Sequence, residues 1–222
     1  MNHHRTDTAH HYWNAEWQRA DGTSPWAEAE PWVIDHAQGF DPCSRILDLG
    51  AGIGRHALHF ARAGHRVTTL DAAEASVAAI GSAALLEGLD IQVLQGQMTD
   101  LPFADASFDH VLSWNVIYHG DEAIVRRTLA EVARVLRPGG TFMATMLSNR
   151  RLAAERSRGP GREISRNTWV FDGPGDKVHP HYFCTAGEVV SHLWGFDLLT
   201  LFDRPHGKPG SWHWHFLAER LG

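Results

Sequence analysis

The chain has 222 residues, 43% of them hydrophobic, and a formal net charge of −6 at pH 7. This length suits one α/β domain with a full hydrophobic core, and the acidic balance provides no basic footprint for nucleic acid. No apolar run approaches the roughly 20 residues that span a bilayer, and the N-terminal MNHHRTDTAHHYW contains no apolar secretory segment. We therefore expect a cytoplasmic protein without membrane or nucleic-acid partners, in which Cys43 and Cys184 are free thiols.

The first two thirds of the chain predict helices and strands in alternation. Two short helices, or a helix and a turn, are expected at 11–20 and 26–37. Strands rich in leucine and β-branched residues then alternate with segments whose apolar residues recur at helical spacing. The expected strands are 45–49, 66–70, 91–95, 108–114 and 141–147, and the expected helices are 55–63, 72–88 and 121–140. Such alternation implies right-handed crossovers and a mainly parallel sheet.

The pattern breaks after residue 147. Residues 148–180 are rich in Arg, Gly, Pro and Ser without a clear period, which predicts a long loop that is functional or disordered. Thr185 and Glu188 then form a capping-box pattern at the start of a further helix, expected at 185–195. Two strands, 196–202 and 212–219, are expected to complete the chain.

The loop GAGIG, residues 50–54, separates the first strand from its helix and allows the backbone to approach a ligand closely. Asp71 ends the second strand, at the same carboxyl edge of the sheet, where ligands of open parallel sheets bind. A carboxylate there can accept both hydroxyls of a ribose, so we expect a ligand that contains a nucleoside. Asp48, just before the loop, suits an ammonium group better than a pyrophosphate.

S-adenosylmethionine contains both a ribose and an ammonium group. The dinucleotide fingerprint G-x-G-x-x-G fits less well, because Gly54 comes one residue early and Arg55 occupies the fingerprint position. This spacing disfavours a nicotinamide-dependent oxidoreductase.

Three segments resemble the ordered motifs of class I S-adenosylmethionine-dependent methyltransferases. ILDLGAGIGRHALHFARAGHRVTTLDAA resembles the first two motifs, LQGQMTDLPFADASFDHVLSWNVIYHG (94–120) the next two, and EVARVLRPGGTFMAT (131–145) the helix, turn and strand that follow. The aromatic stretch HYWNAEWQRADGTSPW is loosely similar to thiol, thiopurine and tellurite-resistance methyltransferases.

The resemblance implies a Rossmann-like, doubly wound α/β fold with a mainly parallel seven-stranded sheet, its last strand antiparallel. It also implies one methyltransferase domain over residues 1–222. Its expected parts are an N-terminal helical lid (1–40), a cofactor-binding core (41–147), a substrate loop (148–184) and a C-terminal helix and strand pair (185–222).

The resemblance also assigns cofactor-binding roles. Gly50, Ala51 and Gly52 would pass under the methionine and ribose, and Asp48 would lie near the amino group. The remaining expected contacts are Asp71 to the ribose hydroxyls, Ala72 beside the adenine, Gln97 to the adenine amino group, Met98 to a ring nitrogen and Asn115 at the methionine end. Asp100 is a second acid near Gln97, and which of the two serves the adenine stays open.

The expected reaction is an SN2 transfer of methyl to a small-molecule nucleophile with a sulfur, selenium, tellurium, nitrogen or oxygen acceptor atom, which leaves S-adenosylhomocysteine. His119 follows the fourth strand and is the best candidate base, since histidine titrates near neutral pH; the alternative is that it only shapes the pocket. His181 and Tyr12 are further catalytic candidates, at the end of the long loop and in the lid. The aromatic residues near Tyr12 could equally staple the N-terminal helix to the core.

No metal is expected, because the histidine pairs lack the spacing of zinc sites. Two other functions stay open. The arginine-rich segment 149–166 is the only support for a nucleic-acid methyltransferase, and a non-catalytic S-adenosylmethionine-binding sensor or partner subunit would keep the same motifs. The sequence is compatible with a monomer or a homodimer.

Overall fold

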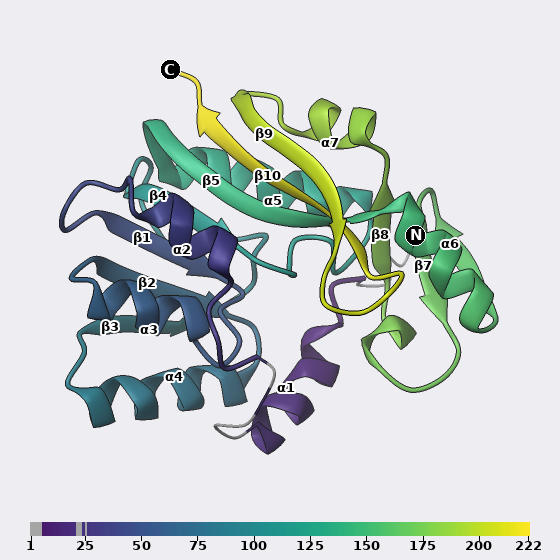
Figure 1. Ribbon diagram of the computed structural model, residues 1–222, viewed down its shortest axis with the longest axis horizontal. Helices are drawn as coiled ribbons and strands as arrows, with labels where there is room; N and C mark the ends of the chain where they lie inside the picture. Colours follow the sequence, from purple (N-terminus) through teal and green to yellow (C-terminus); the bar gives the residue numbers. More distant parts are fainter. Residues whose placement is uncertain (1–5, 21–23, 25) are drawn as a thin grey trace.

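The computed structural model describes residues 6–20, 24 and 26–222. Residues 1–5, 21–23 and 25 of the expected lid lie outside the described residues. In the described part of the chain the sheet has ten strands, seven of which form the expected core in the order β3-β2-β1-β4-β5-β10-β9 (Figure 1). These strands are β1 Arg45–Leu49, β2 Arg66–Asp71, β3 Ile91–Gln95, β4 Phe108–Ser113, β5 Leu136–Ser148, β9 Phe196–Pro205 and β10 Trp212–Arg220.

The direction of these strands confirms the expected doubly wound fold. β1 pairs in parallel with β2 and β4, and β4 pairs in parallel with β5. The last strand, β10, runs antiparallel between β5 and β9, with Ala144 opposite Phe216.

Helices cover both faces of the sheet, because alternate residues of a central strand point to opposite sides. On β1, Ile46 packs with Val33 of α2 (Pro31–Ala37) and Phe60 of α3 (Arg55–Arg62). The next residue, Leu47, belongs to the other apolar cluster, which includes Val132 of α5 (Glu122–Val135). The remaining long helix of the core is α4 (Glu74–Glu87), between β2 and β3.

The ends of the helices are set by capping hydrogen bonds and turns as well as by the apolar pattern. The Asp121 carboxylate accepts a hydrogen bond of 3.0 Å from the Ile124 N–H and so caps α5. This helix ends at Val135 and β5 begins at once, so the expected helix 121–140 is five residues too long. The capping box of α7 (Ala186–His192) is present, with Thr185 and Glu188 bonded to each other's backbone N–H groups.

The segment 148–184 is not the expected loop. It contains α6 (Asn149–Arg158), an antiparallel pair of β6 (Gly161–Ser165) and β7 (Thr168–Phe171), a 3-10 turn η1 (Asp176–Val178) and β8 (His181–Cys184). β8 runs parallel to the end of β5 and antiparallel to β7, which extends the sheet (Figure 1). No residue of α6 is buried and every residue of β6 is exposed, so the sequence had no apolar period to predict them.

The N-terminal helix α1 (His10–Arg19) lies between the half of the sheet that contains β1–β3 and the β6–β8 extension (Figure 1). It has no buried residue. One direct tie to the core is the side-chain oxygen of Asn14, which accepts a 2.9 Å hydrogen bond from the Ala75 N–H at the start of α4.

Candidate cofactor and acceptor site

A cleft of about 930 Å³, open solvent at its mouth included, lies at the carboxyl ends of the parallel strands. All nine residues predicted to bind the cofactor line the cleft: Asp48, Gly50, Ala51, Gly52, Asp71, Ala72, Gln97, Met98 and Asn115.

The glycine loop forms the cleft floor, and its backbone requires glycine. Gly50 and Gly52 have φ angles of 74° and 57°, in the left-handed region. A Cβ at Gly50 would overlap the side chain of Val116, and one at Gly52 would lie 2.9 Å from the Trp17 ring. Any side chain here would therefore fill the space between the loop and its opposite wall.

Asp71 is fixed to the glycine loop. One carboxylate oxygen accepts the Gly52 N–H at 2.9 Å and the other accepts the Ala73 N–H at 2.8 Å. Burial raises the pKa of Asp71, and these backbone N–H groups oppose the shift. The carboxylate lines the cleft, where it suits the hydroxyls of a ribose.

Asp48 lies deeper, only 1% exposed, and accepts the Ala57 N–H at 3.1 Å. Burial raises its pKa to about 7, against the nearby charge of Arg55. The Arg55 guanidinium itself contacts the Glu30 carboxylate at 3.4 Å. Because a buried carboxylate is stabilised by an added positive charge, Asp48 fits the ammonium group of S-adenosylmethionine.

The far wall of the cleft is held by β5. Asn115 has a left-handed φ of 66° and donates its backbone N–H to the Thr145 hydroxyl oxygen at 2.8 Å. The same hydroxyl donates to the Asn115 side-chain oxygen at 3.2 Å. These two hydrogen bonds tie the turn after β4 to β5.

Aromatic side chains of the N-terminal segment close one side of the cleft. The Trp13 and Trp17 rings stack with centroids 5.0 Å apart, and Trp26 packs edge-on against Trp13 at 5.5 Å. All three rings line the cleft. Tyr12, one of the predicted catalytic residues, is not brought to the lining; it packs edge-on against Trp13 at 5.4 Å.

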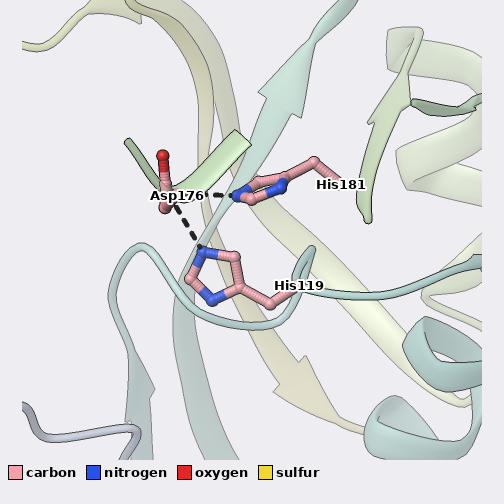
Figure 2. A group of neighbouring side chains, drawn as sticks. All are labelled: His119, Asp176 and His181. Carbon is pink, nitrogen blue, oxygen red and sulfur yellow. Dashed lines mark hydrogen bonds and ion pairs between the residues drawn. The ribbon is translucent and has the colours of Figure 1, made fainter. Parts of the chain in front are cut away.

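The other two predicted catalytic residues meet at an acid that the sequence did not single out (Figure 2). His119 lines the cleft, and its Nε2 lies 3.8 Å from Oδ2 of Asp176, which is too far for a hydrogen bond. His181 is fully buried behind it, with Nε2 at 3.1 Å from the same oxygen. Their backbones are paired, since the Tyr182 N–H donates to the Tyr118 carbonyl at 2.9 Å.

Charge is balanced within this group. Burial would raise the pKa of Asp176, but Lys177 and the two histidines hold it well below its usual range. The Lys177 ammonium lies 3.1 Å from both oxygens of that carboxylate. Burial lowers the pKa of His119, and lowers that of His181 to about 3, with Asp176 opposing both shifts.

A second histidine set lies beside Trp114, another residue of the cleft lining. The His206 ring stacks on His213 at 3.9 Å and on Trp114 at 5.7 Å. Its Nε2 lies 2.5 Å from Nε2 of His215. Burial lowers the pKa values of His206 and His215 to about 3 and 4, so this set forms a neutral wall.

Residues 46–140 match the family model of a methyltransferase domain. Over 108 residues the chain is 41% identical to glycine/sarcosine/dimethylglycine N-methyltransferase of Actinopolyspora halophila, which covers 47% of this chain and 19% of the relative. Over 141 residues it is 36% identical to the phthiotriol/phenolphthiotriol dimycocerosates methyltransferase of Mycobacterium tuberculosis, which covers 60% and 51%. The alignments with the curated relatives span between 19% and 51% of those proteins' own lengths.

Solved structures share the fold over most of the chain. An S-adenosylmethionine-dependent methyltransferase of Methanosarcina mazei superposes with a TM-score of 0.73 at 22% identity, covering 87% of this chain and 99% of that one. The 1,6-didemethyltoxoflavin-N1-methyltransferase of Burkholderia thailandensis, solved with 1,6-didemethyltoxoflavin and S-adenosylhomocysteine bound, gives 0.68 at 23% identity, covering 97% and 85%.

No helix in the described part of the chain is both long and apolar enough to cross a membrane.

The family match, the fold and the fit of the cleft to an adenosyl ligand agree with one another. Residues 46–140 therefore match a methyltransferase domain, and the chain has the fold of S-adenosylmethionine-dependent methyltransferases.

Proposed function

We propose that this protein transfers the methyl group of S-adenosylmethionine to a small-molecule nucleophile with a sulfur, nitrogen or oxygen acceptor atom. The observation that supports this best is one continuous cleft whose lining runs from Gln97 and Met98, past Asp71 and Asp48, to His119. These residues belong to, or follow, β3, β2, β1 and β4, which are neighbours in the sheet in that order, and this order suits adenine, ribose, ammonium and acceptor in turn.

Bound in this cleft, the cofactor would supply a methyl group already activated by its sulfonium. The protein's contribution is position and exclusion of water, which can supply roughly 7–11 kcal/mol. Asp71 and Asp48 orient the two ends of the ligand, and the Trp13 and Trp17 rings shield it from solvent.

His119 is the proposed base for acceptors that are protonated at neutral pH. Its Nε2 faces Asp176, so an Nε2–H directed at this carboxylate leaves the Nδ1 lone pair to accept a proton. Burial lowers the pKa of His119, which keeps the ring in the neutral form that a base requires.

The acceptor is proposed to be small rather than a nucleic acid, because the arginine-rich segment is occupied within the protein. Arg151 and Arg158 pair with Glu155 at 2.9 and 3.3 Å. The Arg150 and Arg156 guanidinium groups lie over the rings of Trp212 and Trp169. The similar enzymes of Actinopolyspora halophila and Burkholderia thailandensis, named for glycine derivatives and a didemethyltoxoflavin, are consistent with a small acceptor.

Calorimetric titration of S-adenosylmethionine, S-adenosylhomocysteine and NADH tests the cofactor site. Both adenosyl ligands should bind in the micromolar range and NADH should not bind. Asp71→Asn should weaken adenosyl binding about ten- to hundredfold, because a charged hydrogen bond contributes about 1.5–3 kcal/mol. The matched control Asp90→Asn alters an exposed aspartate before β3 and should leave the affinity unchanged. Equal affinity in the two variants would remove the ribose role of Asp71.

The base is tested with a panel of thiols, amines and phenols as methyl acceptors. His119→Gln should slow transfer to a phenol or alkyl thiol roughly hundredfold or more, with unchanged affinity for S-adenosylhomocysteine. An arenethiol that is already ionised at pH 7 is the control acceptor and should lose little rate. A uniform loss over all acceptors would mean that His119 only shapes the pocket.

A further inference from the structure

Three ligand-type side chains from two separate segments converge beside the cleft (Figure 2). His119 follows β4, Asp176 begins η1 and His181 begins β8. One nitrogen or oxygen atom of each lies within 4.8 Å of the others. The spacing rules applied to the sequence miss such a group, because 57 residues separate its first member from its second.

The hydrogen-bond partners of the two His181 ring nitrogens indicate that a positive charge is missing beside this residue. Its Nδ1 lies 2.8 Å from the His179 carbonyl and its Nε2 lies 3.1 Å from the Asp176 carboxylate. Both partners can only accept hydrogen bonds, whereas a neutral imidazole has one N–H. One ring nitrogen therefore presents a lone pair to another lone pair, unless a second proton or a cation lies there.

His119 brings a second ring nitrogen to the same carboxylate. Its Nε2 is buried, and among the described residues it has no hydrogen-bond partner. It is directed at the same Asp176 oxygen from 3.8 Å. Two imidazole nitrogens and one carboxylate oxygen thus face a common point.

We propose that His119 Nε2, Asp176 Oδ2 and His181 Nε2 bind one divalent transition-metal ion of the zinc class. Tetrahedral ligands with bonds of about 2.0–2.2 Å are separated by about 3.4 Å. The two carboxylate-to-nitrogen distances are 3.1 and 3.8 Å, and the three atoms all lie within 4.8 Å of one another. The His181 Nδ1–H bond to the His179 carbonyl is the support that metal-bound histidines usually have. Three protein ligands leave a fourth position open.

Lys177 works against this site, because its ammonium lies 3.1 Å from both Asp176 oxygens. The metal takes Oδ2, and Lys177 keeps Oδ1. Repulsion between the two cations weakens binding, so replacing the ammonium with an apolar side chain of similar length should tighten it. Tighter binding after loss of the Lys177 charge is expected only for a bound cation.

Metal binding has a consequence that rests on the proposed function. A metal at Nε2 of a neutral imidazole leaves the proton on Nδ1, so His119 becomes a donor toward the cleft and loses its role as base. Metal-bound protein should therefore methylate protonated acceptors slowly and regain activity when the metal is removed.

The test is a titration of the full chain with Co²⁺ in place of Zn²⁺, followed by visible absorption, which reports the number and geometry of ligands. His119→Gln should weaken this binding more than tenfold, and Lys177→Met should strengthen it severalfold. His206→Ala is the matched control: it removes a histidine of the neighbouring set and should leave the spectrum unchanged. Circular dichroism checks that each variant is folded.

Absence of a cobalt band, or a band that His119→Gln leaves intact, would overturn the proposal and assign any metal to other histidines of the chain. Loss of the band in His206→Ala instead would move the site to the second histidine set and would equally overturn the proposal. The spectrum is read without cofactor or acceptor, so failure here is distinct from failure of adenosyl binding or of methyl transfer.

Discussion

At the scale of the residue, Asp48 is a carboxylate whose burial opposes its own charge. Its pKa is raised to about 7 by burial, so below that pH the free protein carries the protonated acid. An ammonium group favours the ionised form, and binding at low pH must therefore release a proton. Affinity should level off about one pH unit above this pKa and should fall as the pH drops through it.

The expected change in the dissociation constant follows from the titration of one group, Asp48. Between pH 7.5 and 5.5 the dissociation constant of S-adenosylmethionine should rise tenfold or more, on the order of tenfold for each pH unit below the pKa. Calorimetry across this range measures it. Asp48→Asn keeps an oxygen to accept the Ala57 N–H and should bind more weakly at pH 7.5 with a flatter pH profile. An unchanged profile in this variant would assign the titration to Asp71 or to another group.

At the scale of the element, α1 packs against α4 and contributes aromatic side chains to the cleft lining. It has no buried residue, yet the Trp17 ring lies against Gly52 so closely that a Cβ there would be 2.9 Å away. Trp17→Ala should therefore change the melting temperature of the ligand-free protein little. It should weaken S-adenosylhomocysteine about tenfold, a loss of about 1.4 kcal/mol.

Trp194→Ala is the matched control for α1, since this tryptophan is 91% exposed near the end of α7. Calorimetry should find its adenosyl affinity equal to that of the unchanged protein. If Trp17→Ala also leaves affinity intact, α1 is only packed against the core, which is the alternative that the sequence left open for these aromatic residues.

Some strands could be predicted from the sequence and others could not. Strands such as β1 and β3 were predicted to the residue, because buried or half-buried strands show their apolar run directly. The extension β6–β8 was missed because exposed elements have no such run. The cofactor-binding residues could be predicted because each lies at the end of a parallel strand or just after it, and the carboxyl ends of these strands lie at one edge of the sheet. Asp176 could not be predicted, because it meets its partners only when β8 pairs with the turn after β4.

At the scale of the whole molecule, the cofactor cleft joins segments that are far apart in the chain. Its lining includes Trp13 of α1, Asp71 of β2 and His119 after β4. A ligand that contacts all of them binds only the folded protein, so it must stabilise the fold by mass action.

At a hundredfold excess over its dissociation constant, such a ligand adds about 2.7 kcal/mol to the free energy of unfolding. A domain of this size shifts by about 2–4 °C for each kcal/mol, so S-adenosylhomocysteine should raise the melting temperature by roughly 5–10 °C. At the same concentration the Asp71→Asn protein should shift much less and NADH should cause no shift, both followed by differential scanning calorimetry. An equal shift with NADH would mean that the cleft selects only the adenosine half shared by the two ligands, and the role of Asp48 in binding the ammonium would then fail.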